Sequence, residues 1–247
     1  RETIGFMERC AAEGKPFLVQ ASLPRPHAAW TPSEPFWSMY DEDEFTLPPN
    51  VDHDMYRKAP HMCRTAERWR TGEWTKFEPR TYEAGRLRKL HGYLGCVTQC
   101  DHAAGEMLAW LKANGLAEDT IVIYTSDHGD YACEHGLMEK APGICSDAIT
   151  RIPFIWRWPG HFPAGRVAEE IVESVDLSTT LCALAGLDPL ETSDGQDITH
   201  LLRGQRGGVH KIGVTEFAWS KSVRKGHYRY VYYAPEMFPE EYPEGGY

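Results

Sequence analysis

The chain alternates short apolar segments with stretches whose apolar residues recur at helical spacing. Pro16–Leu23, Thr120–Thr125 and Ile152–Trp158 are apolar runs typical of buried strands. Helical spacing runs from Tyr82 to Asn114 and from Val175 to Ala185, and each pattern ends at a glycine. Because strands and helices alternate, the pattern predicts an α/β fold with a mostly parallel central sheet flanked by helices.

Two regions depart from this alternation. Residues Pro32–Arg80 are rich in Pro, Asp, Glu and Trp without a clean period, which predicts a long irregular excursion with a short helix near Cys63–Arg70. After Gly204 the sequence becomes alternating and aromatic, and Lys225–Gly226 marks the turn of an antiparallel hairpin. We therefore expect residues 1–204 to form part of one α/β domain and residues 205–247 to begin a smaller antiparallel subdomain.

Composition excludes several classes of partner. The 247 residues carry a formal net charge of −10, whereas a nucleic-acid-binding protein needs a basic surface. No run approaches the roughly 20 apolar residues of a membrane span, and the first residues lack a signal peptide's apolar core. The seven cysteines form no disulfide pattern, which favours the cytoplasm. A zinc site at Cys96 and Cys100 is disfavoured by their spacing and the lack of a second pair.

Candidate chemistry lies directly after the apolar run Thr120–Thr125. In open α/β sheets, ligands bind beyond the carboxyl ends of the strands, and Asp127 and His128 stand at such an end. A carboxylate and an imidazole there can share one divalent cation. Taken alone, the pair also fits a turn-capping aspartate and a surface histidine.

A longer ordered pattern surrounds this pair. The segment TIVIYTSDHGDYACEHGLMEK, from Thr120 to Lys140, resembles the sulfatase segment in which a strand delivers metal ligands and an active-site lysine follows. Further landmarks of the sulfatase family, which belongs to the alkaline-phosphatase superfamily, are Ser22–Pro32, Arg151-Ile152-Pro153, Trp158-Pro159-Gly160, Val175-Asp176-Leu177 and Leu184-Ala185-Gly186. The resemblance implies an alkaline-phosphatase-like α/β fold and metal-dependent hydrolysis of sulfate esters.

The resemblance also implies residue roles. Asp127 and His128 would be metal ligands, Lys140 a cationic contact to the sulfate group, and His27 a contact to the ester or sulfate oxygens that could protonate the leaving alcohol. Trp30 stands where the family has the second proline of the loop that carries His27. Without the motif, Lys140 would be read as a solvated lysine and His27 as a loop histidine. His135 would orient the loop.

The expected cofactors follow from the same resemblance. Calcium is the expected ion, and Mg²⁺ is an alternative that likewise prefers oxygen ligands. His128 in place of the asparagine of many relatives also admits Mn²⁺, iron or Zn²⁺. The family's nucleophile is a formylglycine made from cysteine in a Cys-x-Pro/Ala-x-Arg motif, which this sequence lacks, together with two further Asp ligands. We therefore expect an internal fragment of a longer enzyme, inactive by itself, with the nucleophile outside this chain.

Two alternatives stay open. One is a phosphonate monoester or phosphodiester hydrolase of the same superfamily, and the other is a non-catalytic member that binds an anionic glycan or a partner protein. Trp37, Trp69 and Trp74 in the irregular excursion could stack on sugar rings or simply pack the loop. The expected substrate is a small-molecule or carbohydrate sulfate ester; the sequence sets neither its identity nor the oligomeric state.

Overall fold

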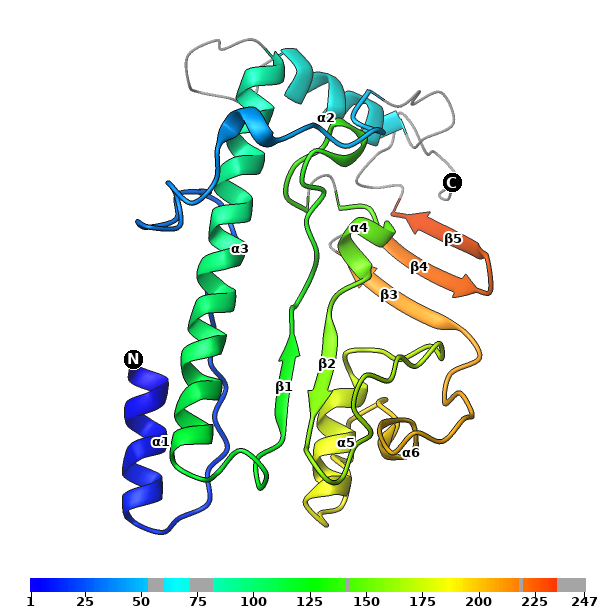
Figure 1. Ribbon diagram of the computed structural model, residues 1–247. Helices are drawn as coiled ribbons and strands as arrows, with labels where there is room; N and C mark the ends of the chain where they lie inside the picture. The colour runs from blue at the N-terminus through cyan, green and yellow to red at the C-terminus, as the bar shows by residue number, and fades with distance from the viewer. Residues whose placement is uncertain (53–59, 72–81, 141–142, 218–219, 235–247) are drawn as a thin grey trace.

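The computed structural model describes residues 1–52, 60–71, 82–140, 143–217 and 220–234 (Figure 1). Its helices are α1 (Glu2–Ala12), α2 (Pro60–Thr71), α3 (Tyr82–Ala113), α4 (Asp147–Thr150), α5 (Asp176–Leu184) and α6 (Thr199–Leu202), with 3₁₀ turns at Glu42–Glu44 and Glu134–Gly136. Its strands are β1 (Val122–Thr125), β2 (Phe154–Arg157), β3 (Gly213–Phe217), β4 (Ser220–Lys225) and β5 (Tyr228–Tyr233). Within these described ranges, no helix is both long and apolar enough to cross a membrane.

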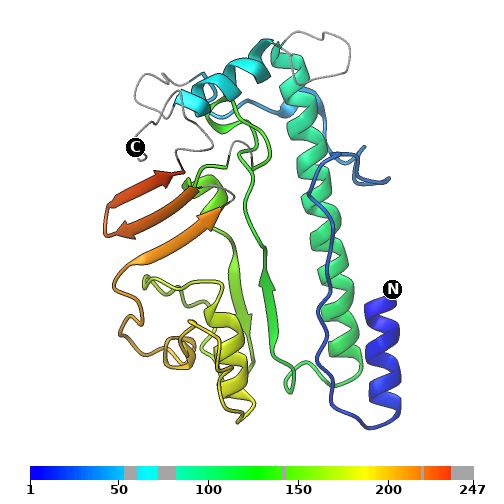
Figure 2. The ribbon, with the colours of Figure 1, turned by 180° about the vertical axis from the view of Figure 1, so that it is seen from behind.

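Helix α3 runs along one side of the molecule, and α1 packs beside its carboxyl-terminal end (Figures 1 and 2). The helix ends where the sequence predicts, at Gly115, which has a φ of 69°. The Leu116 amide donates to Leu111 O at 2.9 Å, closing the last turn. The expected helices at Cys63–Arg70 and Val175–Ala185 are likewise present as α2 and α5, whereas α1 was not anticipated by the sequence pattern.

The strands pair differently from the expected parallel sheet. β1 and β2 are antiparallel, with Val122 opposite Arg157, and β3, β4 and β5 form a separate antiparallel sheet. Between β1 and β2 the chain turns back instead of crossing over the sheet, so the two strands run in opposite directions (Figure 1). The hairpin turn at Lys225–Gly226 is confirmed. A parallel ladder is absent from the part of the chain that the structure describes.

The apolar segment Pro16–Leu23 was expected to be a buried strand, and this expectation is wrong. It runs as extended chain without strand pairing, and Leu18 is 85% exposed. Apolar character alone does not make a strand, because a strand also needs a neighbour to take its backbone hydrogen bonds.

In the described part of the excursion after Pro32, the chain is irregular up to Asp52 apart from the 3₁₀ turn at Glu42–Glu44, and α2 follows; both parts contact α3. The Arg88 guanidinium sits 5.3 Å from the Trp37 ring, and Lys89 Nζ sits 4.0 Å from the Trp69 ring. Both indoles therefore contact α3, which favours the loop-packing interpretation of these tryptophans. Trp74 lies outside the described residues.

The core that supports the candidate site joins three regions. Buried Met62 of α2, Leu137 of the loop after β1, and Tyr233 of β5 belong to one apolar cluster with Tyr131, Ile144 and Ile149. The hairpin is also hydrogen bonded to this region, because Arg229 Nη1 donates to Cys145 O at 2.7 Å. The segment after residue 204 thus packs against the loop that carries the candidate residues.

Candidate active site

The candidate metal pair lies at the carboxyl end of β1, as the sequence predicts. The Asp127 side chain is 87% exposed and that of His128 is 26% exposed. Asp127 Oδ1 accepts the His128 amide at 3.0 Å, and Ser126 Oγ donates to His128 O at 2.8 Å. These contacts fix the turn and leave Asp127 Oδ2 facing solvent, 3.6 Å from His128 Nε2.

Gly129 allows this turn to lie close to α4. Its amide donates to Ile149 O at 2.8 Å, and a Cβ built at Gly129 would lie 2.0 Å from Ala148 O. Any larger residue would push the turn away from α4, and Asp127 and His128 would move with it.

Lys140 lies between two imidazoles. Its Nζ is 3.2 Å from His27 Nε2 and 3.2 Å from His128 Nε2. An ammonium group can only donate, so each Nε2 must accept with its lone pair. The other ring nitrogen carries the proton in each case: His128 Nδ1–H donates to Gly129 O at 2.8 Å, and His27 Nδ1–H donates to Ala28 O at 2.9 Å. The hydrogen-bond network therefore assigns both rings as neutral Nδ1–H tautomers.

His27 reaches the site from a loop that lies on α3. The Cys100 thiol donates to Arg25 O at 3.2 Å, and Ser33 N donates to Gln99 Oε1 at 3.4 Å. The close approach depends on Gly92 of α3, where a Cβ would lie 2.2 Å from the backbone oxygen of Trp30. The four residues named by the sequence resemblance, Asp127, His128, Lys140 and His27, are thus brought together from separate segments.

The loop between His128 and Lys140 has an unusual backbone. Ala132, Cys133, His135 and Glu139 all have positive φ, from 44° to 75°. Each such non-glycine residue costs on the order of 1 kcal/mol, so the surrounding contacts must hold the loop in place.

Asp130 provides two of these contacts. Its Oδ1 accepts the Ala132 amide at 2.8 Å and the Glu139 amide at 3.0 Å. Burial raises the pKa of Asp130, and the two backbone donors oppose that rise. From α3, Arg86 Nη2 donates to Gly136 O at 2.8 Å.

Other titratable groups behind this loop are shifted by burial. Burial raises the pKa of Cys133 to about 11 and that of Tyr131 to about 12. Burial also lowers the pKa of Lys89 to about 8, more strongly than neighbouring charges act on it. The Cys133 thiol therefore stays protonated at neutral pH, which argues against a role as nucleophile.

The donor set fits part of a metal site. Two donors 3.6 Å apart can both lie about 2.3 Å from one point, the distance typical of calcium–oxygen ligation. Among the described residues, no group of three or more His, Cys, Asp or Glu side chains is positioned to hold an ion. Asp127 and His128 thus fit two ligands of a divalent cation whose remaining ligands would come from elsewhere.

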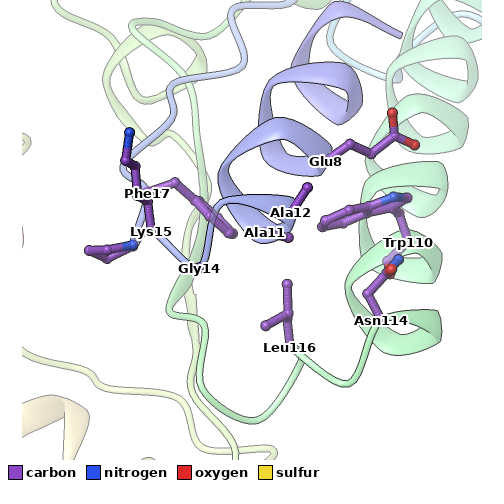
Figure 3. A pocket seen from close by; sticks show the side chains of 10 residues that line it. Glu8, Ala11, Ala12, Gly14, Lys15, Phe17, Trp110, Asn114 and Leu116 are labelled. Atoms are coloured by element: carbon purple, nitrogen blue, oxygen red, sulfur yellow. The ribbon is translucent and has the colours of Figure 1, made fainter.

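A separate pocket of about 680 Å³ lies away from these residues, between α1 and the carboxyl-terminal end of α3 (Figure 3). Phe17, Trp110 and Leu116 line it together with Glu8 and Asn114. It contains none of the candidate residues. This depression and the candidate chemistry are therefore different places in the part of the chain that the structure describes.

Sequence reasoning missed the supporting residues. Asp130, Arg86 and Gly129 hold the turn and the loop, and Gly129 and Asp130 lie inside the segment Thr120–Lys140 that carries the resemblance, yet no role was predicted for any of the three. The buried histidines His61 and His91, each only 3% exposed, belong to none of the motifs found in the sequence.

Comparison with known proteins identifies the family. The sulfatase family profile matches residues 2–187, so the chain belongs to the sulfatase family. It is 28% identical over 197 residues to the multifunctional alkaline phosphatase superfamily protein PehA of Trinickia caryophylli, covering 77% of this chain and 38% of that protein. It is 28% identical over 223 residues to an arylsulfatase of Clostridium perfringens, covering 86% of this chain and 44% of that protein.

Solved structures support the α/β class of fold. The phosphonate monoester hydrolase of Silicibacter pomeroyi superposes with a TM-score of 0.77 at 22% identity, covering 94% of this chain and 52% of that one. The structure of BT4656 in complex with its substrate D-glucosamine-2-N,6-O-disulfate gives a TM-score of 0.81 at 18% identity, covering 97% of this chain and 63% of that one. The chain spans less than half the length of the two curated relatives, PehA and the arylsulfatase.

Proposed function

We propose that this chain supplies the metal-binding and sulfate-binding part of the active site of a sulfuric ester hydrolase. The observation that carries the proposal is the placement of Lys140 Nζ within 3.2 Å of both His27 and His128, beside the exposed Asp127 carboxylate. Membership of the sulfatase family supports it, because relatives include an arylsulfatase.

Each residue has a distinct task in this proposal. Asp127 and His128 hold a divalent cation, with calcium proposed, and a bound cation neutralises charge on the sulfuryl oxygens. Because His128 Nε2 cannot ligate a cation and accept from Lys140 at the same time, the Lys140 ammonium would leave His128 when the cation binds. Lys140 then donates to a non-bridging sulfuryl oxygen, where negative charge grows in the transition state. His27 is exposed. Once Lys140 donates to the sulfate group instead of to His27 Nε2, that nitrogen can take up a proton from solvent, pass it to the oxygen of the leaving alcohol and return to the neutral form.

The attacking group is not among these residues. The 247 residues contain no Cys-x-Pro/Ala-x-Arg motif, so we propose that the formylglycine nucleophile belongs to a part of the protein outside this sequence. The task of this chain is then to bind the sulfate group, neutralise its charge and protonate the leaving group.

The proposed substrate is a small-molecule or carbohydrate sulfate ester. BT4656, whose fold is similar, was solved with a sulfated glucosamine as its substrate. Phosphonate monoester hydrolysis is the second candidate, because a phosphonate monoester hydrolase superposes over 94% of the chain. Both reactions place charge on oxygens beside a cation, so Lys140 and Asp127 serve either.

The test compares variants of the full-length protein on an aryl sulfate and an aryl phosphonate monoester. Lys140→Ala and Asp127→Asn should each lower kcat/KM by about 10²–10³-fold without loss of the fold. Lys112→Ala, which removes an exposed lysine near the end of α3, is the matched control and should leave kcat/KM unchanged. Wild-type turnover by Lys140→Ala and Asp127→Asn would refute the site.

Metal removal tests the same site independently. A chelator should abolish turnover of both substrates, and titration with Ca²⁺, Mn²⁺, Mg²⁺ or Zn²⁺ should show which ion restores it. Full activity after exhaustive chelation would contradict the assignment of Asp127 and His128 as ligands.

A further inference from the structure

The loop from Asp130 to Glu139 is the backbone connection between the candidate metal pair and Lys140. Every non-glycine residue with positive φ in the part of the chain that the structure describes lies here: Ala132, Cys133, His135 and Glu139. Left-handed backbone at non-glycine residues persists only where surrounding contacts over-determine it, and it clusters at functional sites. The loop is therefore held in a conformation that its own sequence does not favour.

One carboxylate closes the two ends of this loop. Asp130 Oδ1 accepts the Ala132 amide at 2.8 Å and the Glu139 amide at 3.0 Å. The Tyr131 amide in turn donates to Glu139 O at 3.0 Å. The amide and the carbonyl oxygen of Glu139 are thus both hydrogen bonded to the start of the loop. The backbone position of the next residue, Lys140, is therefore fixed.

A guanidinium from α3 binds the backbone inside the loop, at Gly136. Arg86 is 5% exposed, and its Nη2 donates to Gly136 O at 2.8 Å. The buried Cys133 thiol also points toward α3, with its Sγ 3.9 Å from Arg86 O. The loop is consequently tied to the helix on which the loop carrying His27 also lies.

We propose that Asp130 is a positioning residue that sets where Lys140 meets a sulfate group, with Arg86 as the second anchor of the same loop. This inference rests on the proposed function of Lys140. Asp130 acts through the backbone of Glu139, whose amide donates to Asp130 Oδ1 at 3.0 Å. Without the hydrogen bond from the Glu139 amide to Asp130, the loop relaxes, and the Lys140 ammonium moves from its place between the two imidazoles.

The variants Asp130→Ala and Asp130→Asn separate positioning from bulk stability. Asparagine keeps an Oδ1 that accepts both amides, whereas alanine removes the acceptor. In the full-length protein, Asp130→Ala should lower kcat/KM for an aryl sulfate by about 10²-fold, as expected when a catalytic group is misplaced by about 1 Å. Asp130→Asn should remain within a few-fold of the wild type.

Three further measurements test whether the loss of kcat/KM in Asp130→Ala comes from a displaced Lys140. Hydrogen exchange of residues 131–139 should accelerate in Asp130→Ala and not in Asp130→Asn. Asp130→Ala should cause no further loss of kcat/KM in the Lys140→Ala background, because it acts through Lys140. Asp197→Ala, which removes a carboxylate that accepts the Thr199 amide at 2.8 Å at the start of α6, is the matched control and should change neither readout.

The results that would overturn the inference are distinct from failure of the proposed function. Unchanged exchange in Asp130→Ala, or an equal loss of kcat/KM with and without Lys140, would show that Asp130 does not position that lysine. If the wild type turns over no sulfate ester, the proposed function fails, and affinity for inorganic sulfate replaces kcat/KM in the same cycle. Equal sulfate affinity in wild type and Asp130→Ala would then overturn the positioning role.

Discussion

At the scale of single residues, the site depends on the close approach of its backbone turn to α4 as much as on the chemistry of its side chains. Gly129→Ala places a methyl group 2.0 Å from Ala148 O, so the turn and α4 must separate. We expect the variant to lose about 1–3 kcal/mol in the free energy of unfolding, typical of overpacking, and to bind the activating metal more weakly. Chemical denaturation and a metal titration of the full-length protein measure the two effects.

The control for this variant is another glycine-to-alanine change. Gly105 lies inside α3, and a Cβ there would meet no atom within 4 Å. Gly105→Ala should therefore raise the free energy of unfolding by about 0.5–1 kcal/mol, because alanine restricts the unfolded chain and favours the helix. Equal effects of Gly105→Ala and Gly129→Ala would contradict the steric argument.

Single residues also show how far the sequence can be used for prediction. Asp127, His128, Lys140 and His27 could be chosen because they occupy an ordered motif, and the structure brings them together. Asp130 lies in the same motif, but its supporting role could not be predicted from it. Its contact with Glu139 depends on positive φ values at non-glycine residues, which no residue type in that loop signals.

At the scale of elements, α5 is fixed by a buried carboxylate. Asp176 is fully buried and accepts the Glu173 and Gln196 amides at 2.8 Å each, and His210 Nε2 at 2.9 Å. Asp176→Ala would leave these donors without their partner inside the fold. We expect the free energy of unfolding to fall by about 3–5 kcal/mol, as when one member of a buried pair is removed.

Urea unfolding of Asp176→Ala beside Asp188→Ala measures this effect. Asp188 is exposed just after α5, so its removal should change the free energy of unfolding by less than about 0.5 kcal/mol. Asp176→Asn should lie between the two, because one oxygen remains to accept an amide. A loss of less than about 1 kcal/mol in Asp176→Ala would mean that this carboxylate does not hold α5 in place.

Helices and strands differed in how well their patterns predicted them. The end of α3 at Gly115 and the hairpin turn at Gly226 depend on local spacing and on residues that adopt positive φ, so the sequence was sufficient. Pairing direction is not local. The antiparallel pairing of β1 and β2, and the absence of strand pairing at Pro16–Leu23, depend on which segments become neighbours.

At the scale of the whole molecule, one core connects α2, the loop of the candidate site and the hairpin. Met62, Leu137 and Tyr233 share this cluster, although they are distant in sequence. The site loop is therefore supported by this core as well as by α3. Changes that weaken the packing of this core should lower the free energy of unfolding of the whole fold. A change of pH can do this without any substitution of the site residues.

His61 makes that core sensitive to acid. It packs edge-on against Tyr233, with ring centroids 4.5 Å apart, and burial together with the charge of Arg64 lowers its pKa from 6.5 to about 4. Because the folded-state pKa lies below the unfolded value, the unfolded chain takes up the proton first as the pH falls. The neutral imidazole thus contributes stability above pH 6.5, and this contribution is lost between pH 6.5 and 4.

His61→Phe removes the titrating group while keeping an aromatic ring beside Tyr233. Because each pKa unit corresponds to about 1.4 kcal/mol, the wild type should lose up to about 3 kcal/mol more than His61→Phe when the pH is lowered from 6.5 to 4. The readout is the pH dependence of the free energy of unfolding, not its value at one pH, because the substitution also changes other contacts of His61. Identical pH dependence in wild type and His61→Phe would mean that acid destabilises the protein through other groups and that His61 does not couple the core to pH.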